Sequence, residues 1–279
     1  MIETLYLNGC SWTEGHLLHE EKHIMEYAET IGYKFYDKWL ARKDNKDVGF
    51  PYRDIFDKFN FAANIAKKLN IPNIHNDAIG GGSNSRILRT TIDYIKNLSE
   101  EEKTKTLVIV GWTLADRNEL FLEDKTGNAD WARFNVAHRF NEFENDKFTE
   151  EFSKKVDKFW ELYVVDIHSY YYSIKKFFEQ SYLLANLLEN HKIKYYFFNT
   201  FPIFWGYEKV HLDPNWILDF QKDIEIHNNN NSILSTDVTF QEYIQFKENC
   251  HVSDGHPNSL GHKLWADYII QDLKDRRIV

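Results

Sequence analysis

The sequence has few cysteines and no long apolar run, and each shortage excludes a class of protein. Only 2 of its 279 residues are cysteines, too few for a disulfide framework, which indicates a reducing compartment. No apolar run approaches the roughly 20 residues of a membrane span. The first residues, Met1-Ile2-Glu3, lack the basic and apolar regions of a signal peptide. We therefore expect a chain without a leader or a membrane span.

Basic residues are also scarce. The chain has 34 Lys and Arg against 43 Asp and Glu, a net charge of −9. Because nucleic-acid affinity depends on clustered basic side chains, this balance argues against a nucleic-acid binder. The 12 histidines show no spacing typical of metal ligands, so no metal is expected. With 43% hydrophobic residues the chain can build a sizeable core, and we expect one domain over residues 1–279.

Strand and helix signals alternate along the chain. Short apolar or aromatic segments predict buried strands at about residues 4–8, 74–78, 106–111 and 195–198. Apolar residues at helical spacing predict helices at about residues 17–31, 61–69, 87–95, 167–190 and 260–269. The alternation predicts a flavodoxin-like, three-layer α/β/α sandwich whose mostly parallel sheet has five strands in the order 2-1-3-4-5.

Two polar, aromatic-rich insertions interrupt this pattern, at about residues 36–57 and 112–166. The second follows a predicted strand and is far longer than the about 2–6 residues of an ordinary strand-to-helix loop. We expect it to form a lid or a helical excursion that borders or covers a ligand-binding crevice.

The unusual small and polar residues lie where predicted strands end: Gly9-Cys10-Ser11, Gly80-Gly81-Gly82, Gly111-Trp112-Thr113 and Asn199-Thr200. In an open parallel sheet such loops share the carboxyl edge, where ligands bind. The segment Asp254-Gly255-His256, just before the last predicted helix, can reach the same edge. We therefore expect all five segments to line one crevice.

An acid and an imidazole two positions apart suit a general base and the carboxylate that orients it. His256 is the predicted base and Asp254 the predicted orienting acid. A base of this kind needs a nucleophile, and Ser11 stands at the turn after the first strand. Alternatives remain: His251 or His262 as the base, Ser11 as a helix cap and Asp254 as a turn cap.

Taken in order, these segments resemble the SGNH (GDSL-type) hydrolase family, and its phage-associated branch most of all. Gly9-Cys10-Ser11 resembles the first motif, Gly-Asp-Ser, with Cys10 in place of the acid. Asn76 to Gly81 resembles the second motif. Gly111-Trp112-Thr113 stands where the family has Gly-x-Asn, and Asp254-Gly255-His256 resembles Asp-x-x-His with one residue fewer.

The resemblance implies ester hydrolysis through an acyl-enzyme, without a cofactor. It gives Ser11 the role of nucleophile, His256 that of base and Asp254 that of orienting acid.

Acyl transfer also needs hydrogen-bond donors for the oxyanion. The resemblance implies the backbone N–H groups of Ser11 and Gly81. Because the family's asparagine is absent, the side chain of Asn84 or Thr113 is expected to supply a further donor.

Trp12, Trp112 and Arg117 are predicted to contact the substrate, and Trp205 is a further candidate for the groove wall. The tryptophans could instead be ordinary core residues. Arg117 could instead form an exposed ion pair with Glu119 on a short helix.

Two functions follow as expectations. The first is a serine esterase that removes O-acyl groups such as acetyl from a carbohydrate; an acyltransferase would use the same residues. The second is a catalytically inactive glycan-binding or structural, virion-associated protein on the same fold, because fold alone does not establish activity. The partner is expected to be a small-molecule or carbohydrate ester, in a soluble, cytoplasmic or virion-associated protein whose oligomeric state stays open.

Overall fold

The computed structural model describes most of the chain. The described residues are 1–15, 18, 21–30, 52–123, 125–127, 129–134, 150–203, 215, 219–220, 222–223, 238–252 and 255–279.

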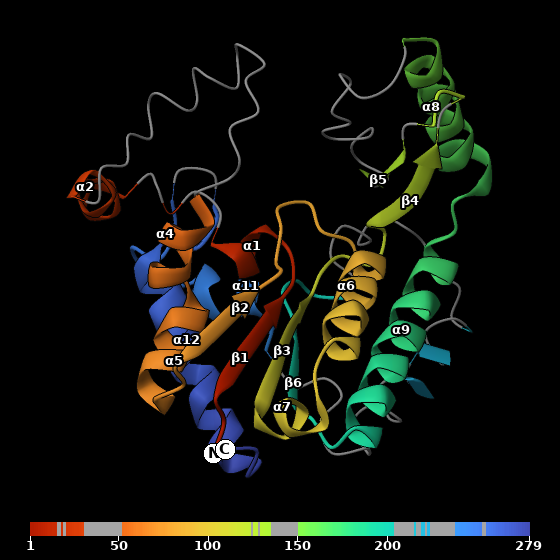
Figure 1. Ribbon diagram of the computed structural model, residues 1–279. Helices are drawn as coiled ribbons and strands as arrows, with labels where there is room; N and C mark the ends of the chain where they lie inside the picture. The colour runs from red at the N-terminus through yellow and green to blue at the C-terminus, as the bar shows by residue number, and fades with distance from the viewer. Residues whose placement is uncertain are drawn as a thin grey trace.

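A four-stranded parallel sheet forms the centre of these described residues (Figure 1). Strand β1 (Thr4–Asn8) pairs with β2 (Asn73–Asn76) on one side and with β3 (Thr106–Trp112) on the other, and β3 pairs with β6 (Lys194–Asn199). The sequence-based prediction of a flavodoxin-type parallel sheet with the first strand inside it is confirmed. A fifth strand of this sheet is not found among the described residues.

Helices cover both faces of the sheet (Figure 1). Helices α5 (Phe61–Leu69) and α12 (Ser259–Asp275) lie on one face, and α6 (Asn84–Lys96) and α9 (Tyr170–Asn190) lie on the other. All of β3 is buried, as its continuous apolar run predicts.

Side chains of β3 alternate between two core clusters. Leu107 and Ile109 pack in the cluster on the α5 and α12 side, whereas Val108, Val110 and Trp112 pack in the cluster on the α6 and α9 side. The period of two in a strand explains this division.

Polar caps begin the helices that border the sheet's carboxyl edge. Asn60 accepts a hydrogen bond from Ala63 N at the start of α5, and Ser83 accepts one from Arg86 N at the start of α6. Asn258 does the same for α12, accepting from Gly261 N. The caps fix where each helix begins and therefore how the preceding loop enters it.

Shorter helices complete this part of the structure: α1 (Ser11–Glu14), α2 (Lys22–Thr30), α4 (Tyr52–Phe59), α7 (Glu100–Lys105) and α11 (Phe240–Gln245). Of the helix predicted at residues 17–31, the structure has α2; α1 precedes the predicted range and ends at Gly15, which is in the left-handed conformation. Of the predicted insertion at residues 36–57, only residues 52–57 are described, and they belong to α4.

The predicted excursion at residues 112–166 contains strands as well as helices. Strand β4 (Asn118–Glu123) pairs with β5 (Ala129–Phe134) as an antiparallel hairpin, and α8 (Glu150–Leu162) and a π-helical turn, η3 (Tyr163–Ile167), follow. The hairpin and α8 extend beyond the carboxyl ends of the sheet strands (Figure 1). The described part of this insertion is therefore helical only in α8 and η3, and its role as a lid stays a prediction.

Among the helices of the described ranges, none has both the length and the apolar character that crossing a bilayer requires.

Candidate active site

The site is built around one contact between the two ends of the chain. Ser11 is the first residue of α1, directly after β1, and His256 lies in the loop before α12. Ser11 Oγ lies 2.9 Å from His256 Nε2, within ordinary hydrogen-bond distance. Ser11 is only 8% exposed, and His256 is partly buried.

Two glycines allow α1 to pack closely on the sheet. A Cβ atom at Gly9 would lie 2.2 Å from Thr13 Oγ1, and one at Gly111 would lie 2.5 Å from the same oxygen. Larger residues at either position would displace Thr13 and, with it, the turn that contains Ser11.

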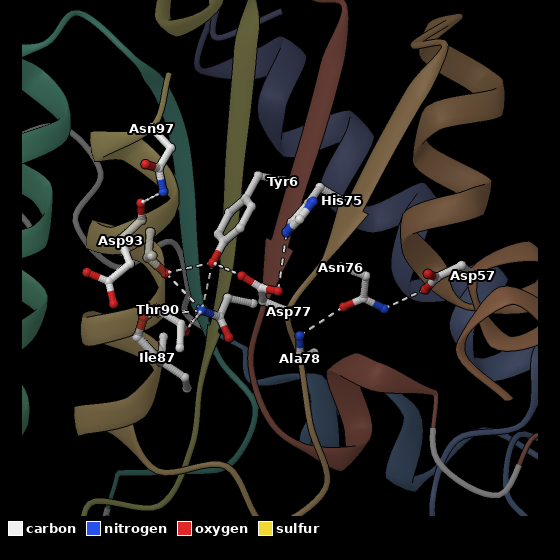
Figure 2. Close-up of polar contacts among 12 residues, drawn as sticks. Tyr6, Asp57, His75, Asn76, Asp77, Ala78, Ile87, Thr90, Asp93 and Asn97 are labelled. Carbon is white, nitrogen blue, oxygen red and sulfur yellow. Dashed lines mark hydrogen bonds and ion pairs between the residues drawn. The ribbon is translucent and has the colours of Figure 1, made fainter. Parts of the chain in front are cut away.

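A buried polar network lies next to the turn after β1 (Figure 2). Asn8 Oδ1 accepts a hydrogen bond from Gly9 N at 2.9 Å, while Asn8 Nδ2 lies 2.8 Å from Thr90 Oγ1 and 3.0 Å from Tyr6 OH. Tyr6 OH in turn donates to Asp77 Oδ2 at 2.9 Å. The network joins the end of β1 to α6 and to the loop after β2.

Tyr6 and Asp77, two hydrogen-bonded residues of this network, differ in ionisation. Burial and the charge of Asp77 raise the pKa of Tyr6, which therefore stays a neutral donor. Burial alone would raise the pKa of Asp77, but hydrogen bonds from His75 and Tyr6 hold it below its ordinary value. Asp77 is therefore an ionised acceptor on the loop that leads to Gly81.

The loop from Asn76 to Gly82 is tied down at several points. Asn76 Nδ2 donates to Asp57 Oδ1 on α4 at 2.6 Å, and Asn76 Oδ1 accepts from Ala78 N (Figure 2). Gly81 has φ +68°, a conformation that favours glycine.

Glu14 is a residue of this site that the sequence analysis missed. Its Oε2 accepts a hydrogen bond from Gly80 N at 2.7 Å, which connects the helix of Ser11 to the loop of Gly81. A second link runs from Ile79 N to Gly9 O at 3.2 Å. An acid three residues after a serine is a weak sequence signal, because only the folded loop reveals its partner.

Asn84 holds the loop that follows β3. Its Oδ1 accepts from Thr113 N at 2.9 Å, and its Nδ2 lies 3.2 Å from Thr113 O and 3.4 Å from Leu114 O. The amide is thus engaged with backbone groups, which disfavours Asn84 as an oxyanion donor. Thr113 Oγ1 is buried and has no hydrogen-bond partner within the described part of the chain.

The loop around His256 is shaped by its own backbone. Val252 N donates to His256 O at 2.9 Å, and Gly255, at φ +89°, makes the sharp turn just before the histidine. Ser259, at the start of α12, donates from N and Oγ to the Glu21 carboxylate. Asp254 lies outside the described residues.

The two alternative histidines occupy structural positions. His251 has Gly255 O and Ile244 O at 3.1 and 3.2 Å from its ring nitrogens. His262 is fully buried next to Phe61 and Phe240, and burial lowers its pKa to about 3. Among the described residues, neither His251 nor His262 forms a hydrogen bond with Ser11, whereas His256 does.

The predicted tryptophans differ in position. Trp12 packs by ring edges against Phe201 at 5.3 Å, and its ring centroid lies 5.9 Å from that of His256. Trp112 is fully buried against Phe197 in the core on the α6 and α9 side, which leaves it no surface for a substrate. Trp205 lies outside the described residues.

Arg117 lies after β3 in a turn closed by a hydrogen bond from its N–H to Leu114 O. Its guanidinium lies 5.8 Å from the Phe201 ring. Glu119 does not pair with it: Arg89 Nε and Nη2 donate to the two Glu119 carboxylate oxygens at 3.0 Å each. The expected exposed pair of Arg117 and Glu119 is therefore wrong.

Other candidate chemistry is limited in the described ranges. Cys10 and Cys250 are both free and buried. No group of three or more His, Cys, Asp or Glu residues there is arranged to hold a metal ion.

Comparisons with known proteins add a family and a set of similar structures. The model of a family described as of unknown function, DUF6071, matches residues 40–240, a span that includes neither Ser11 nor His256. No curated protein matches the sequence.

Similar solved structures include the crystal structure of TesA, at 12% identity and a TM-score of 0.47, covering 98% of this chain and 99% of that one. The psychrotrophic esterase EstA from Pseudoalteromonas sp., inhibited by monoethylphosphonate, has 11% identity and a TM-score of 0.46, with 98% and 97% coverage. A member of the lipolytic G-D-S-L family from Veillonella parvula has 11% identity and a TM-score of 0.41, with 96% coverage of both chains.

These structures are similar to the chain at low identity and do not assign its activity. The family match, in contrast, covers well over half of the sequence. The chain therefore belongs to the DUF6071 family, whose function is unknown.

Proposed function

We propose that this protein is a serine esterase of the SGNH type, which hydrolyses its substrate through an acyl-enzyme. The observation that supports the proposal most strongly is the distance of 2.9 Å between Ser11 Oγ and His256 Nε2. A serine hydroxyl is a poor nucleophile at neutral pH unless a neighbouring base takes its proton. His256 is within the reach that general-base catalysis requires.

The reaction proceeds in two halves. Ser11 Oγ attacks the ester carbonyl while its proton passes to His256 Nε2; the imidazolium then protonates the leaving alkoxide, which departs as the alcohol. In the second half, His256 takes a proton from water, and the resulting attack releases the acid and returns the proton to Ser11 Oγ.

The negative oxygen of each tetrahedral intermediate needs donors. We assign this role to the backbone N–H groups of Ser11 and Gly81 and to the Thr113 hydroxyl. Thr113 Oγ1 is buried without a partner among the described residues, and Glu14 holds the loop of Gly81 near Ser11. The loss of one such donor typically lowers kcat by about 10²–10³-fold.

Asp254 is proposed to orient His256 and to stabilise its protonated form. The turn at Gly255, with φ +89°, supports this role because it can bring a carboxylate two residues away back toward the imidazole.

The proposed substrate is an O-acylated carbohydrate. The hairpin of β4 and β5 presents Phe121 and Trp131 as an exposed ring pair, 5.3 Å apart. Flat apolar rings suit the faces of sugars, and we propose that this excursion borders the crevice.

The test combines hydrolysis with active-site labelling. Wild-type protein should hydrolyse 4-nitrophenyl acetate and an acetylated oligosaccharide, and should react with a fluorophosphonate probe. Ser11→Ala should abolish hydrolysis and labelling, whereas Ser99→Ala, which changes a serine in the cap of α7, should retain both. Wild-type protein inert toward both esters and the probe would favour the non-catalytic function.

A further inference from the structure

Arg117, a cation near the proposed active site, lacks hydrogen-bond acceptors for part of its guanidinium among the described residues. Arg117 is partly buried, and its Nε and Nη1 atoms are shielded from solvent with no hydrogen-bond partner in the described ranges. By comparison, Arg89 has Glu119, Arg276 has Asp272, and Arg86 donates to Asp77 O.

A buried guanidinium without hydrogen-bond acceptors lowers the free energy of unfolding. A guanidinium has N–H donors in a fixed planar arrangement, and donors removed from water without acceptors destabilise the folded state. Such a group is retained where a ligand supplies the acceptors. Among the described residues, the Nε and Nη1 donors of Arg117 are therefore available to the acceptor oxygens of a ligand.

The surroundings of Arg117 define the chemistry of that ligand. The Phe201 ring, 5.8 Å away, provides an apolar wall. Thr200 Oγ1 is also buried without a partner in the described part of the chain, and Thr200 N donates to Trp112 O across the ends of β3 and β6. A single guanidinium with a neutral hydroxyl at the same edge fits one carboxylate, the planar anion that arginine binds in a bidentate manner.

The location connects this anion site to the proposed reaction. Phe201 contacts Trp12 at 5.3 Å, and Trp12 lies 5.9 Å from His256, both measured between ring centroids. Two aromatic rings, Phe201 and Trp12, thus connect Arg117 to His256 through successive contacts. This proximity suits a carboxylate elsewhere on the same substrate molecule.

We infer that Arg117 binds a carboxylate of the substrate and that the protein prefers esters with a carboxylate in the acyl or alcohol part, such as an acylated sugar acid. The substrate preference rests on the proposed esterase function; the anion site does not. The overall charge of −9 repels anions, so a specific cation is needed to select one.

The preference is tested with two esters of one size, 3-acetoxybenzoate and 3-acetoxybenzamide, which differ only in the charged group. Wild-type kcat/KM should favour the carboxylate. In Arg117→Gln the ratio of the two kcat/KM values should fall by about 10- to 100-fold, the usual effect of a charge-assisted hydrogen bond. Arg276→Gln removes the same charge from a helix end at the opposite edge of the sheet and should retain the wild-type ratio.

Direct binding provides a readout that is independent of hydrolysis. By calorimetry, benzoate should bind wild-type protein more tightly than benzamide, and Arg117→Gln should remove the difference. The variant should also fold and be at least as heat-stable as wild type, because it loses an unpartnered cation. Arg117→Lys should retain part of the benzoate binding.

The outcomes separate the two proposals. Benzoate binding that depends on Arg117 in a protein that hydrolyses neither ester would support the anion site and reject the esterase. Hydrolysis of both esters at an unchanged ratio in Arg117→Gln, or benzoate binding unaffected by the substitution, would overturn the role of Arg117 and leave the esterase intact.

Discussion

Glu14 connects the candidate nucleophile to the candidate oxyanion loop. It belongs to the same single-turn helix as Ser11, and its carboxylate accepts a hydrogen bond from Gly80 N at 2.7 Å. We infer a positioning role: the contact fixes Gly80 and thereby the direction of the N–H of the next residue, Gly81. Donors act efficiently only when they are already in place as charge develops on the oxyanion.

Glu14→Ala should therefore lower kcat of ester hydrolysis by about 10²-fold, with a much smaller change in KM, because the oxyanion forms only after the substrate has bound. Glu14→Gln retains an acceptor oxygen and should stay within a few-fold of wild type. Steady-state kinetics of both variants check this. Equal losses in both, or a loss confined to KM, would contradict the positioning role.

His262 should make the protein less stable in acid. Burial, followed by the charge of His256, lowers its pKa from 6.5 to about 3. Between these values the unfolded state binds a proton and the folded state does not. The free energy of unfolding should then decrease as the pH falls through this window, by at most about 1.4 kcal/mol per pH unit.

His262→Leu, a substitution by an apolar side chain of similar size, should flatten this dependence between about pH 6.5 and 4. Urea denaturation at several pH values measures it. His23→Leu, at an exposed position, is the matched control and should leave the slope unchanged. An identical slope in wild type and His262→Leu would refute the assignment.

Residue identities and strand spacing predicted part of the site. Ser11 and His256 were recognisable as a hydroxyl and a base in loops that share one edge. The burial of Trp112 was also implicit, because it has the same parity along β3 as Val108 and Val110. In contrast, the engagement of Asn84 with backbone groups depends on the folded loop after β3, which no spacing reveals.

At the scale of elements, the sequence predicted segments whose apolar pattern is strong. β1 and β3 are mostly apolar, and α5, α6 and α9 have apolar faces and polar caps. The β4 and β5 hairpin was missed because its pattern is short and partly exposed. Its position depends on a tertiary contact, the pairing of Glu119 with Arg89 on α6, which the local sequence does not show.

Removing this contact should loosen the hairpin. The Glu119 side chain is only 2% exposed and accepts two hydrogen bonds from Arg89. Glu119→Gln should lower the free energy of unfolding by about 1–3 kcal/mol and accelerate limited proteolysis of the hairpin. Glu123→Gln, at the exposed end of the same strand, is the control. Equal stability and cleavage of the two variants would contradict the anchoring role.

At the scale of the whole molecule, the fold brings together residues from opposite ends of the chain. Ser11 and His256 are 245 positions apart, yet β1 lies inside the sheet and the loop before α12 returns to the same edge. Parallel alternation predicted this convergence, because it aligns the strand ends. The distance between the two side chains could not be predicted, since it depends on the turns at Gly9 and Gly255 and on the anchoring of α12 by Glu21.

The most direct test of the account is to identify the residue that a fluorophosphonate probe modifies, by mass spectrometry of the labelled peptides. Ser11 should bear the adduct, and His256→Gln should slow the labelling at least about 100-fold, because the nucleophile loses its base. The neighbouring Cys10, fully buried, should remain unmodified. An adduct on any other residue, or labelling of Ser11 at the wild-type rate in His256→Gln, would contradict the central claim that these two side chains act as nucleophile and base.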